Sequence, residues 1–245
     1  MSRLPVTLVT GATLVIALVL AGRHAPEALA RVGTFRATDH EFRGLRFLTG
    51  ETVLRTAGIG PEANLWDDPT PWVERLEKHP LVLDARVERR FPGTLVLTVE
   101  ERAPVGLVPN PLLEPVDREG RFLPLDPSRF PMDHPILRPG PVAGGGGEAS
   151  LVQRRRLAEA AEVMRHESDF WSQVSEVRPG PHGGFEVEWG QPTVLFRLSA
   201  PVELRRIREG MAALQDARSR NEGRSPRSID LRFAGRVILG WEEPA

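Results

Sequence analysis

The six histidines offer the widest range of chemistry in this chain, because imidazole can ligate metals and transfer protons. None belongs to an HExxH arrangement, in which two histidines and a glutamate share one helix face around zinc. The run HESD at 166–169 has suitable residue types, but consecutive helical residues point about 100° apart. That run therefore favours a solvated helix end, and DHP at 133–135 favours a turn rather than a metal site.

Nucleophilic and phosphate-binding motifs are absent as well. The chain has no cysteine, which removes thiolate nucleophiles, disulfides and cysteine-based zinc sites. There is no GxSxG motif, and the glycines at 144–147 lack the following Lys-Ser/Thr of a phosphate loop. Glu100 and Glu101 hold adjacent strand positions, so their side chains point to opposite faces. The sequence predicts a protein that is not an enzyme and takes no cofactor, metal or small-molecule substrate.

Charge gives no sign of a polyanionic partner. The 245 residues carry 32 basic and 33 acidic side chains, a net charge of −1, which argues against nucleic-acid binding. Two arginine clusters, at 154–156 and at Arg205, Arg206 and Arg208, spread around predicted helices, and we expect solvated faces there. With 40% hydrophobic and 27% charged residues, the chain has the composition of a folded protein with a sizeable core.

The N-terminal segment is apolar and uncharged throughout residues 4–22. At about 1.5 Å per residue this run makes a helix of about 28 Å, close to the ~30 Å hydrocarbon core of a bilayer. We expect a transmembrane helix at 4–22 after a cytoplasmic tail at 1–3, with the rest of the chain outside the cytoplasm. The alternative is an export signal cleaved at Ala28-Leu29-Ala30, but that sequence lies about eight residues beyond the apolar run.

The sequence that follows forms two groups of elements. In the first group we expect a strand at 34–42, helices at 49–57 and 71–78, and strands at 82–90 and 94–100. Thr49 and Thr70 are the predicted N-caps of the two helices, and Gly58 is the predicted stop of the first. Alternation in the last strand places three apolar side chains on one face: Leu95, Leu97 and Val99.

The second group begins near residue 105 and is richer in strands. We expect strands at 105–108, 174–177, 185–189, 193–198, 229–233 and 236–241. The sequence DREG at 117–120 predicts a hairpin turn in which Gly120 takes a positive φ. Two amphipathic helices, one at 151–166 and one that begins near Leu204, complete the group, and the Gly-rich stretch at 139–148 predicts a flexible loop.

Residues 85–105 resemble a motif of the bacterial cell-division family FtsQ/DivIB. The family pattern is A-x-V-x-R-x-(F/W/Y)-P-x-T-L-x-(I/V)-x-V-x-E-R-x-P-(V/A), and the chain meets it without gaps, except that Leu97 replaces Ile or Val. Five further segments fit the family in order: 41–59, 76–82, 115–125, 135–137 and 228–239. The resemblance covers nearly all of residues 35–241.

The resemblance implies an α+β fold. A single N-terminal transmembrane helix would be followed by a POTRA domain at 35–104 and by a mixed or antiparallel β-domain with two flanking helices at 105–241. The family's function is that of a non-enzymatic, single-pass scaffold of the divisome at the septum. It lies in the cell inner membrane with a cytoplasmic N-terminus, and the bulk of the chain is periplasmic. The short tail and the Gly-rich loop depart from the family pattern.

The resemblance also implies partners. Such a scaffold links early division proteins to the septal peptidoglycan synthases through FtsB/DivIC and FtsL, with weaker contacts to FtsK, FtsW and FtsI. The family's terminal strand is where FtsB docks by strand addition, and Phe233, Gly240 and Trp241 resemble its aromatic, glycine and tryptophan positions.

The candidate partner-binding site is therefore the last predicted strand. An apolar strand at a sheet edge exposes unpaired backbone groups unless charge or proline blunts it, and here only Arg236 does so. The site would comprise Phe233, Arg236, Val237, Ile238, Leu239, Gly240 and Trp241, with the two aromatic residues as anchors. The alternative is that Val237 and Leu239 simply pack inward on the core.

Two other functions fit parts of the sequence. POTRA domains also occur in outer-membrane secretion or assembly factors, which need a following barrel of many alternating strands of ~10 residues. Only residues 105–245 remain here, and amphipathic helices occupy part of them. An exported periplasmic protein with a cleaved signal is the second alternative, and it lacks a catalytic constellation.

Overall fold

The computed structural model describes residues 35–126, 129–130, 132–141, 147–220 and 225–241. The chain forms two compact units that divide between Arg102 and Ala103. The transmembrane helix predicted at 4–22 lies outside the described residues. Within the described ranges, no helix is both long enough and apolar enough to cross a bilayer.

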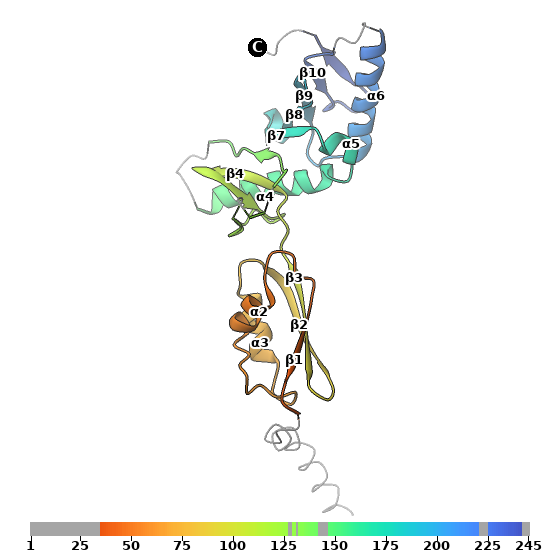
Figure 1. Ribbon diagram of the computed structural model, residues 1–245. Coiled ribbons are helices and arrows are strands. Elements are labelled where there is room, and N and C mark those ends of the chain that lie inside the picture. The colour runs from red at the N-terminus through yellow and green to blue at the C-terminus, as the bar shows by residue number, and fades with distance from the viewer. Residues whose placement is uncertain (1–34, 127–128, 131, 142–146, 221–224, 242–245) are drawn as a thin grey trace, which may run out of the picture. The chain divides into compact units, whose positions relative to one another are not determined.

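The first unit is a three-stranded sheet with two helices packed on one of its faces (Figure 1). Its elements are β1 (Asp39–Arg43), α2 (Gly50–Ala57), α3 (Thr70–Glu77), β2 (Val82–Arg90) and β3 (Thr94–Glu101). The strand order is β1-β3-β2, so β3 is central, parallel to β1 and antiparallel to β2. The predicted elements are all present, with limits shifted by a few residues.

Local signals account for the limits of α2. The Thr49 hydroxyl accepts the N–H of Thr52 at 3.2 Å, and Gly58 ends the helix in the left-handed conformation with φ 72°. The predictions for both residues are confirmed. The predicted cap of α3 is wrong, because Thr70 is already inside the helix and its N–H is accepted by the Asp68 carboxylate at 3.0 Å.

The core of the first unit depends on β3. Leu95, Leu97 and Val99 are at most 1% exposed and pack in one apolar cluster, as the alternation predicts. At the end of the strand, the Glu101 carboxylate accepts the backbone N–H groups of three residues before α2, at 2.6–3.0 Å: Arg46, Phe47 and Leu48. Glu101 thus positions a loop, which gives one of the paired carboxylates a structural role.

The second unit is an eight-stranded sheet with three α-helices. Its strands are β4 (Gly106–Asn110), β5 (Leu112–Val116), β6 (Ile136–Leu137), β7 (Val174–Pro179), β8 (Phe185–Trp189), β9 (Val194–Leu198), β10 (Ser228–Asp230) and β11 (Ile238–Gly240). Its helices are α4 (Glu148–Met164), α5 (Ser168–Trp171) and α6 (Leu204–Arg220), with a 3₁₀ turn η2 (Pro181–Gly183). The order β11-β10-β9-β8-β7-β6-β4-β5 mixes parallel and antiparallel pairs, and the predicted α+β class is confirmed.

Apolar helix stripes cover one face of the larger sheet. Leu157, Ala160, Ala161 and Met164 of α4 are all buried against the strands, as the 3.6-residue period predicts. The Trp189 indole donates its N–H to the Phe170 carbonyl at 2.8 Å, which joins β8 to α5 inside the core. Gly120 has a φ of 73° in the hairpin turn, and this prediction is also confirmed.

The last two strands are shorter than predicted. The strand expected at 229–233 ends at Asp230, and the one expected at 236–241 pairs only over Ile238–Gly240. Between them the chain leaves the sheet, because Leu231 packs into the core and a turn follows in which Gly235 takes a φ of 67°. A short β10–β11 hairpin with a long connection results.

Candidate partner-binding edge

β11 is the outermost strand of the eight-stranded sheet. It runs antiparallel to β10, and the facing pairs are Ser228 with Gly240, Ile229 with Leu239, and Asp230 with Ile238. Within the described part of the chain, no strand pairs with its other side. An outermost strand of this kind can receive an added strand through backbone hydrogen bonds.

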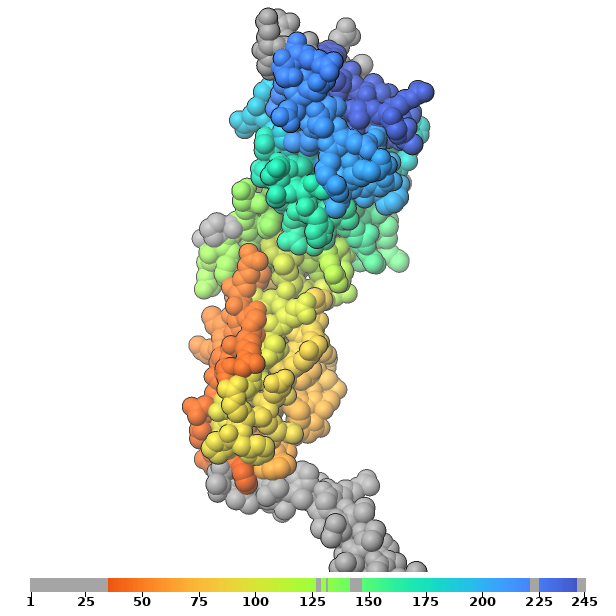
Figure 2. Space-filling view, turned by 90° about the vertical axis from the view of Figure 1, so that its right-hand side faces the viewer, coloured from red at the N-terminus to blue at the C-terminus, as the bar shows by residue number. Residues whose placement is uncertain are grey.

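Side chains around β11 divide between the core and solvent. Val237 and Leu239 are partly buried and pack against the core of the second unit. Phe233, Ile238 and Trp241 are 50%, 48% and 46% exposed. The inward-packing alternative therefore holds for two residues. Ile238 and Trp241 are exposed on β11 and just after it, in the dark blue part of Figure 2. Phe233 is exposed in the connection before β11, where it lines a pocket with residues that include Pro181 and Ala200.

Gly240 lies very close to Ser228 of β10. A Cβ at this position would lie 2.4 Å from the Ser228 hydroxyl oxygen, which is closer than real contacts allow. The Gly240 carbonyl also accepts the Arg227 N–H at 2.7 Å. Gly240 thus belongs to the site as a backbone position rather than as a surface for side-chain contact.

A partly buried ion pair lies at the end of β10, next to the edge. Arg232 donates to the two Asp230 carboxylate oxygens at 2.9 Å and 2.6 Å. Burial alone would raise the pKa of Asp230, but the hydrogen bonds and charge of Arg232, together with the charge of Arg197, outweigh it and hold that pKa below its usual value. Asp230 is therefore ionised at neutral pH.

Ion pairs continue from this point across the helix-free face of the sheet. Glu186 on β8 lies between Arg197 of β9 and Arg178 of β7, at 3.3 Å and 3.1 Å. Arg178 also pairs with Glu188, and Arg138 with Glu176. Positive and negative groups alternate, so this face offers no field of a single sign to steer a charged partner.

The opposite edge of the sheet is also apolar, and sequence reasoning missed it. Leu112 on β5 is 78% exposed, and Leu113 is exposed as well. Pro111 and Pro115 lie in and beside this strand, and proline has no N–H to donate to an added strand. The prolines therefore disfavour addition of a strand at β5, whereas β11 contains no proline.

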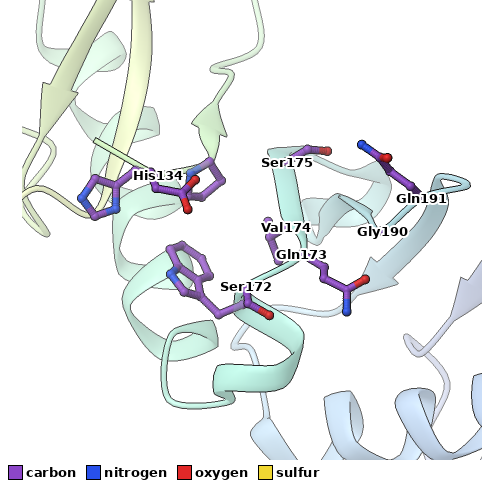
Figure 3. A pocket seen from close by; sticks show the side chains of 10 residues that line it. His134, Ser172, Gln173, Val174, Ser175, Gly190 and Gln191 are labelled. Atoms are coloured by element: carbon purple, nitrogen blue, oxygen red, sulfur yellow. The ribbon is translucent and has the colours of Figure 1, made fainter. Parts of the chain in front are cut away.

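The residues considered for metal or acid–base chemistry lie at two described places, an open cleft and the end of α4. Asp133 and His134 lie beside Ser172, Gln173 and others around an open cleft of about 610 Å³ (Figure 3). His166 is exposed just after α4, as expected for a solvated helix end. Among the described residues, no three His, Asp or Glu side chains are placed to share a metal ion.

The expectation of solvated arginine faces is wrong at Arg154 and Arg206. Arg154 is partly buried, packs over the Phe122 ring at 4.5 Å and donates to the Gly120 carbonyl at 3.0 Å. Arg206 is only 6% exposed, whereas Arg156 is exposed as expected, with its guanidinium 5.7 Å from the Phe185 ring centre. The long side chains reach backbone carbonyls of neighbouring loops, a non-local contact that helix periodicity alone does not predict.

Comparisons with known proteins agree on one family. The POTRA domain, FtsQ-type, matches residues 39–102, which correspond to β1 through β3. The chain is 31% identical to the Cell division protein FtsQ of Rhodothermus marinus over 224 residues, 84% of this chain and 78% of that protein. It is 32% identical to FtsQ of Myxococcus fulvus over 56% of this chain and 50% of that one. The Cell division protein DivIB of Geobacillus kaustophilus is 31% identical over 49% and 45%, respectively.

Proposed function

The chain belongs to the FtsQ/DivIB family of bacterial cell-division proteins, and from that membership we propose that it is a non-enzymatic scaffold of the divisome. Its first unit is an FtsQ-type POTRA domain. The scaffold links early division proteins to the septal peptidoglycan synthases. FtsB/DivIC and FtsL are its main proposed partners, with weaker contacts to FtsK, FtsW and FtsI.

The docking site in this proposal is the outer edge of β11. The observation that carries it is the combination of an open strand edge with three exposed apolar side chains: Phe233, Ile238 and Trp241. Single exposed apolar residues are ordinary, but three of them on an edge strand and in the connection that leads to it favour association. Backbone bonds along 236–240 would supply much of the affinity, and the aromatic rings would act as anchors.

Two substitutions test this site in the full-length protein, with the FtsB homologue of the same bacterium as the probe. Trp241→Ala removes an anchor. Leu239→Pro removes a backbone donor from the open side of β11, because Gly240 bonds to Arg227 and the backbone groups of neighbouring strand residues point in opposite directions. Each is expected to weaken binding at least tenfold, or ~1.4 kcal/mol, in a titration of nanodisc-embedded protein. Undiminished binding by both variants would remove β11 from the site.

A matched control is available on the opposite edge. Leu112→Ala removes an exposed apolar side chain from β5, where the prolines blunt the edge. It is expected to leave binding within twofold of the wild-type value. Hydrogen exchange of β8 and β9 in every variant establishes that the sheet itself is intact, so that a loss of binding reports on the edge.

The proposal places the protein in the inner membrane through an uncleaved anchor at 4–22, with the two units outside the cytoplasm. Its support is the length and lack of charge of that segment, and the family's place at the septum. N-terminal sequencing of the mature protein separates the two possibilities. An intact start is expected, and a start just after Ala30 would replace the anchor by a cleaved signal.

A further inference from the structure

Arg206 on α6 lies behind the proposed docking edge. It is 6% exposed, and its guanidinium reaches three backbone carbonyls of the connection between β10 and β11. Nε and Nη2 donate to Leu231 O at 3.2 Å and 3.1 Å, and Nη2 also donates to Phe233 O at 2.9 Å and to Arg236 O at 2.5 Å. Glu209, one turn further along α6, pairs with Nη1.

These contacts give the connection donors in addition to its own bond from the Arg236 N–H to the Phe233 carbonyl at 3.2 Å. The segment 231–237 has left the sheet, so the strand ladder does not pair its carbonyls. A guanidinium has five donors in a rigid fork and no acceptor, so one Arg206 side chain can bind several carbonyls that converge on one point. The bonded carbonyls belong to Leu231 just after β10, to Phe233, and to Arg236 two residues before β11.

The helix also approaches this segment closely at a second position. A Cβ at Gly210, one turn after Arg206, would lie 2.8 Å from a Leu231 methyl carbon. Gly210 is buried together with Ala217 on the same helix. Arg206 and Gly210 thus make one side of α6 a surface on which the 231–236 connection rests.

We propose that Arg206 is a positioning residue of the docking edge. It fixes the path of residues 231–236, and so sets both the direction of the Phe233 ring and the start of β11. It does so without touching the partner, since its side chain is buried. This inference rests on the proposed function, because it assumes that β11 is the edge that the partner meets.

The first test compares two substitutions on α6 in the full-length protein, with the FtsB homologue as the probe. Arg206→Met keeps the length of the side chain and removes every donor. It is expected to weaken binding at least tenfold and to accelerate hydrogen exchange at 231–240, with β8 and β9 unchanged. Arg205→Met is the control, because Arg205 is exposed and forms its ion pairs with Glu203 and Glu209. It is expected to bind normally.

A second test separates positioning from general stability. A Cβ on Gly240 would lie 3.7 Å from the Ser228 Cβ, within the ~3.5–4.5 Å that a disulfide requires, and the chain has no other cysteine. In the Arg206→Met background, the pair Ser228→Cys and Gly240→Cys therefore ties β11 to β10 when oxidised. Oxidation is expected to bring binding within threefold of the oxidised pair that retains Arg206, and reduction to abolish that recovery.

The outcomes are decisive in each direction. Binding of Arg206→Met at the wild-type level, while Trp241→Ala is impaired, overturns the role of Arg206 and leaves the docking edge standing. Normal binding by all of these variants removes the docking edge itself. A formed disulfide that restores slow exchange at 231–240 but not binding overturns positioning as the mechanism. If Arg206→Met disrupts the whole unit, Arg206→Gln replaces it in the same binding and exchange measurements, because the Gln amide keeps two N–H donors.

Discussion

β3 and β11 are apolar strands in very different positions. β3 lies in the middle of the POTRA sheet, with β1 on one side and β2 on the other. Its inward residues, Leu95, Leu97 and Val99, are fully buried. β11 lies at the end of the larger sheet with β10 as its only described strand neighbour, and it buries its apolar residues only in part.

The difference shows that strand position, rather than apolar content, decides what a strand does. A central strand has both sets of backbone groups paired, so its side chains can contribute only to stability. An edge strand has one unpaired set, and outward apolar side chains beside it add surface for a partner. A comparison of equal substitutions in the two strands measures this division directly.

The largest effect is expected at the centre of β3. Leu97→Ala removes a fully buried side chain and leaves a cavity between the sheet and the helices, so it should lower the unfolding free energy of the POTRA domain by roughly 2–5 kcal/mol. Hydrogen exchange of the full-length protein in denaturant measures this at the β3 amides. Thr98→Ala, on the opposite face, is the control, and equal stability of the two variants would contradict the assigned face.

The same substitution at the edge should cost less. Leu239 is partly buried on the outermost strand, so Leu239→Ala removes less buried area and leaves a space that solvent can reach. We expect a loss of about 1–2 kcal/mol, limited to the β10–β11 hairpin. Hydrogen exchange of the β10 and β11 amides measures this loss of stability. A loss as large as that of Leu97→Ala would show that the edge is part of the cooperative core.

Much of this contrast could be predicted from local sequence. Alternation identified the buried face of β3, and Thr49 and Gly58 marked the ends of α2, because these signals act within a few residues. The α4 stripe followed from helical period alone in the same way.

The parts that could not be predicted depend on long-range contacts. The burial of Arg206 follows from carbonyls that lie 25 or more residues further along the chain. The length of β11 depends on where the 231–236 connection rests on α6. The apolar edge at β5 was missed because Leu112 is next to prolines, which suggest a loop rather than a strand.

Acid should destabilise the β10–β11 hairpin as Asp230 becomes protonated. Asp230 has a lowered pKa in the folded protein, so its ion pair with Arg232 adds stability above the ordinary carboxyl value of 3.8, and that stability is lost as pH falls through the lowered value. Exchange at β10 and β11, corrected for intrinsic rates, should therefore accelerate below about pH 4. Asp230→Asn should abolish this dependence, and an unchanged profile in that variant would assign it to another group.

The POTRA domain should respond to acid earlier, and this is the smallest effect we expect. His79 lies between α3 and β2, and its Nδ1 accepts the Leu81 N–H at 3.2 Å. Burial lowers the pKa of His79, although the charge of Glu101 partly opposes it. A lowered pKa means that the fold favours neutral imidazole.

The stability that comes from the neutral imidazole is present above the ordinary pKa of 6.5, and it is lost as pH falls through the lowered pKa. Exchange at the start of β2 should therefore accelerate slightly between pH 7 and pH 5, where β11 does not change because Asp230 stays ionised. His79→Gln keeps an acceptor for Leu81 and cannot be protonated in this range, so it should remove the dependence. Slower exchange of the wild-type protein at pH 5 than at pH 7 would reverse the sign and show that the attraction of Glu101 for the imidazolium outweighs burial.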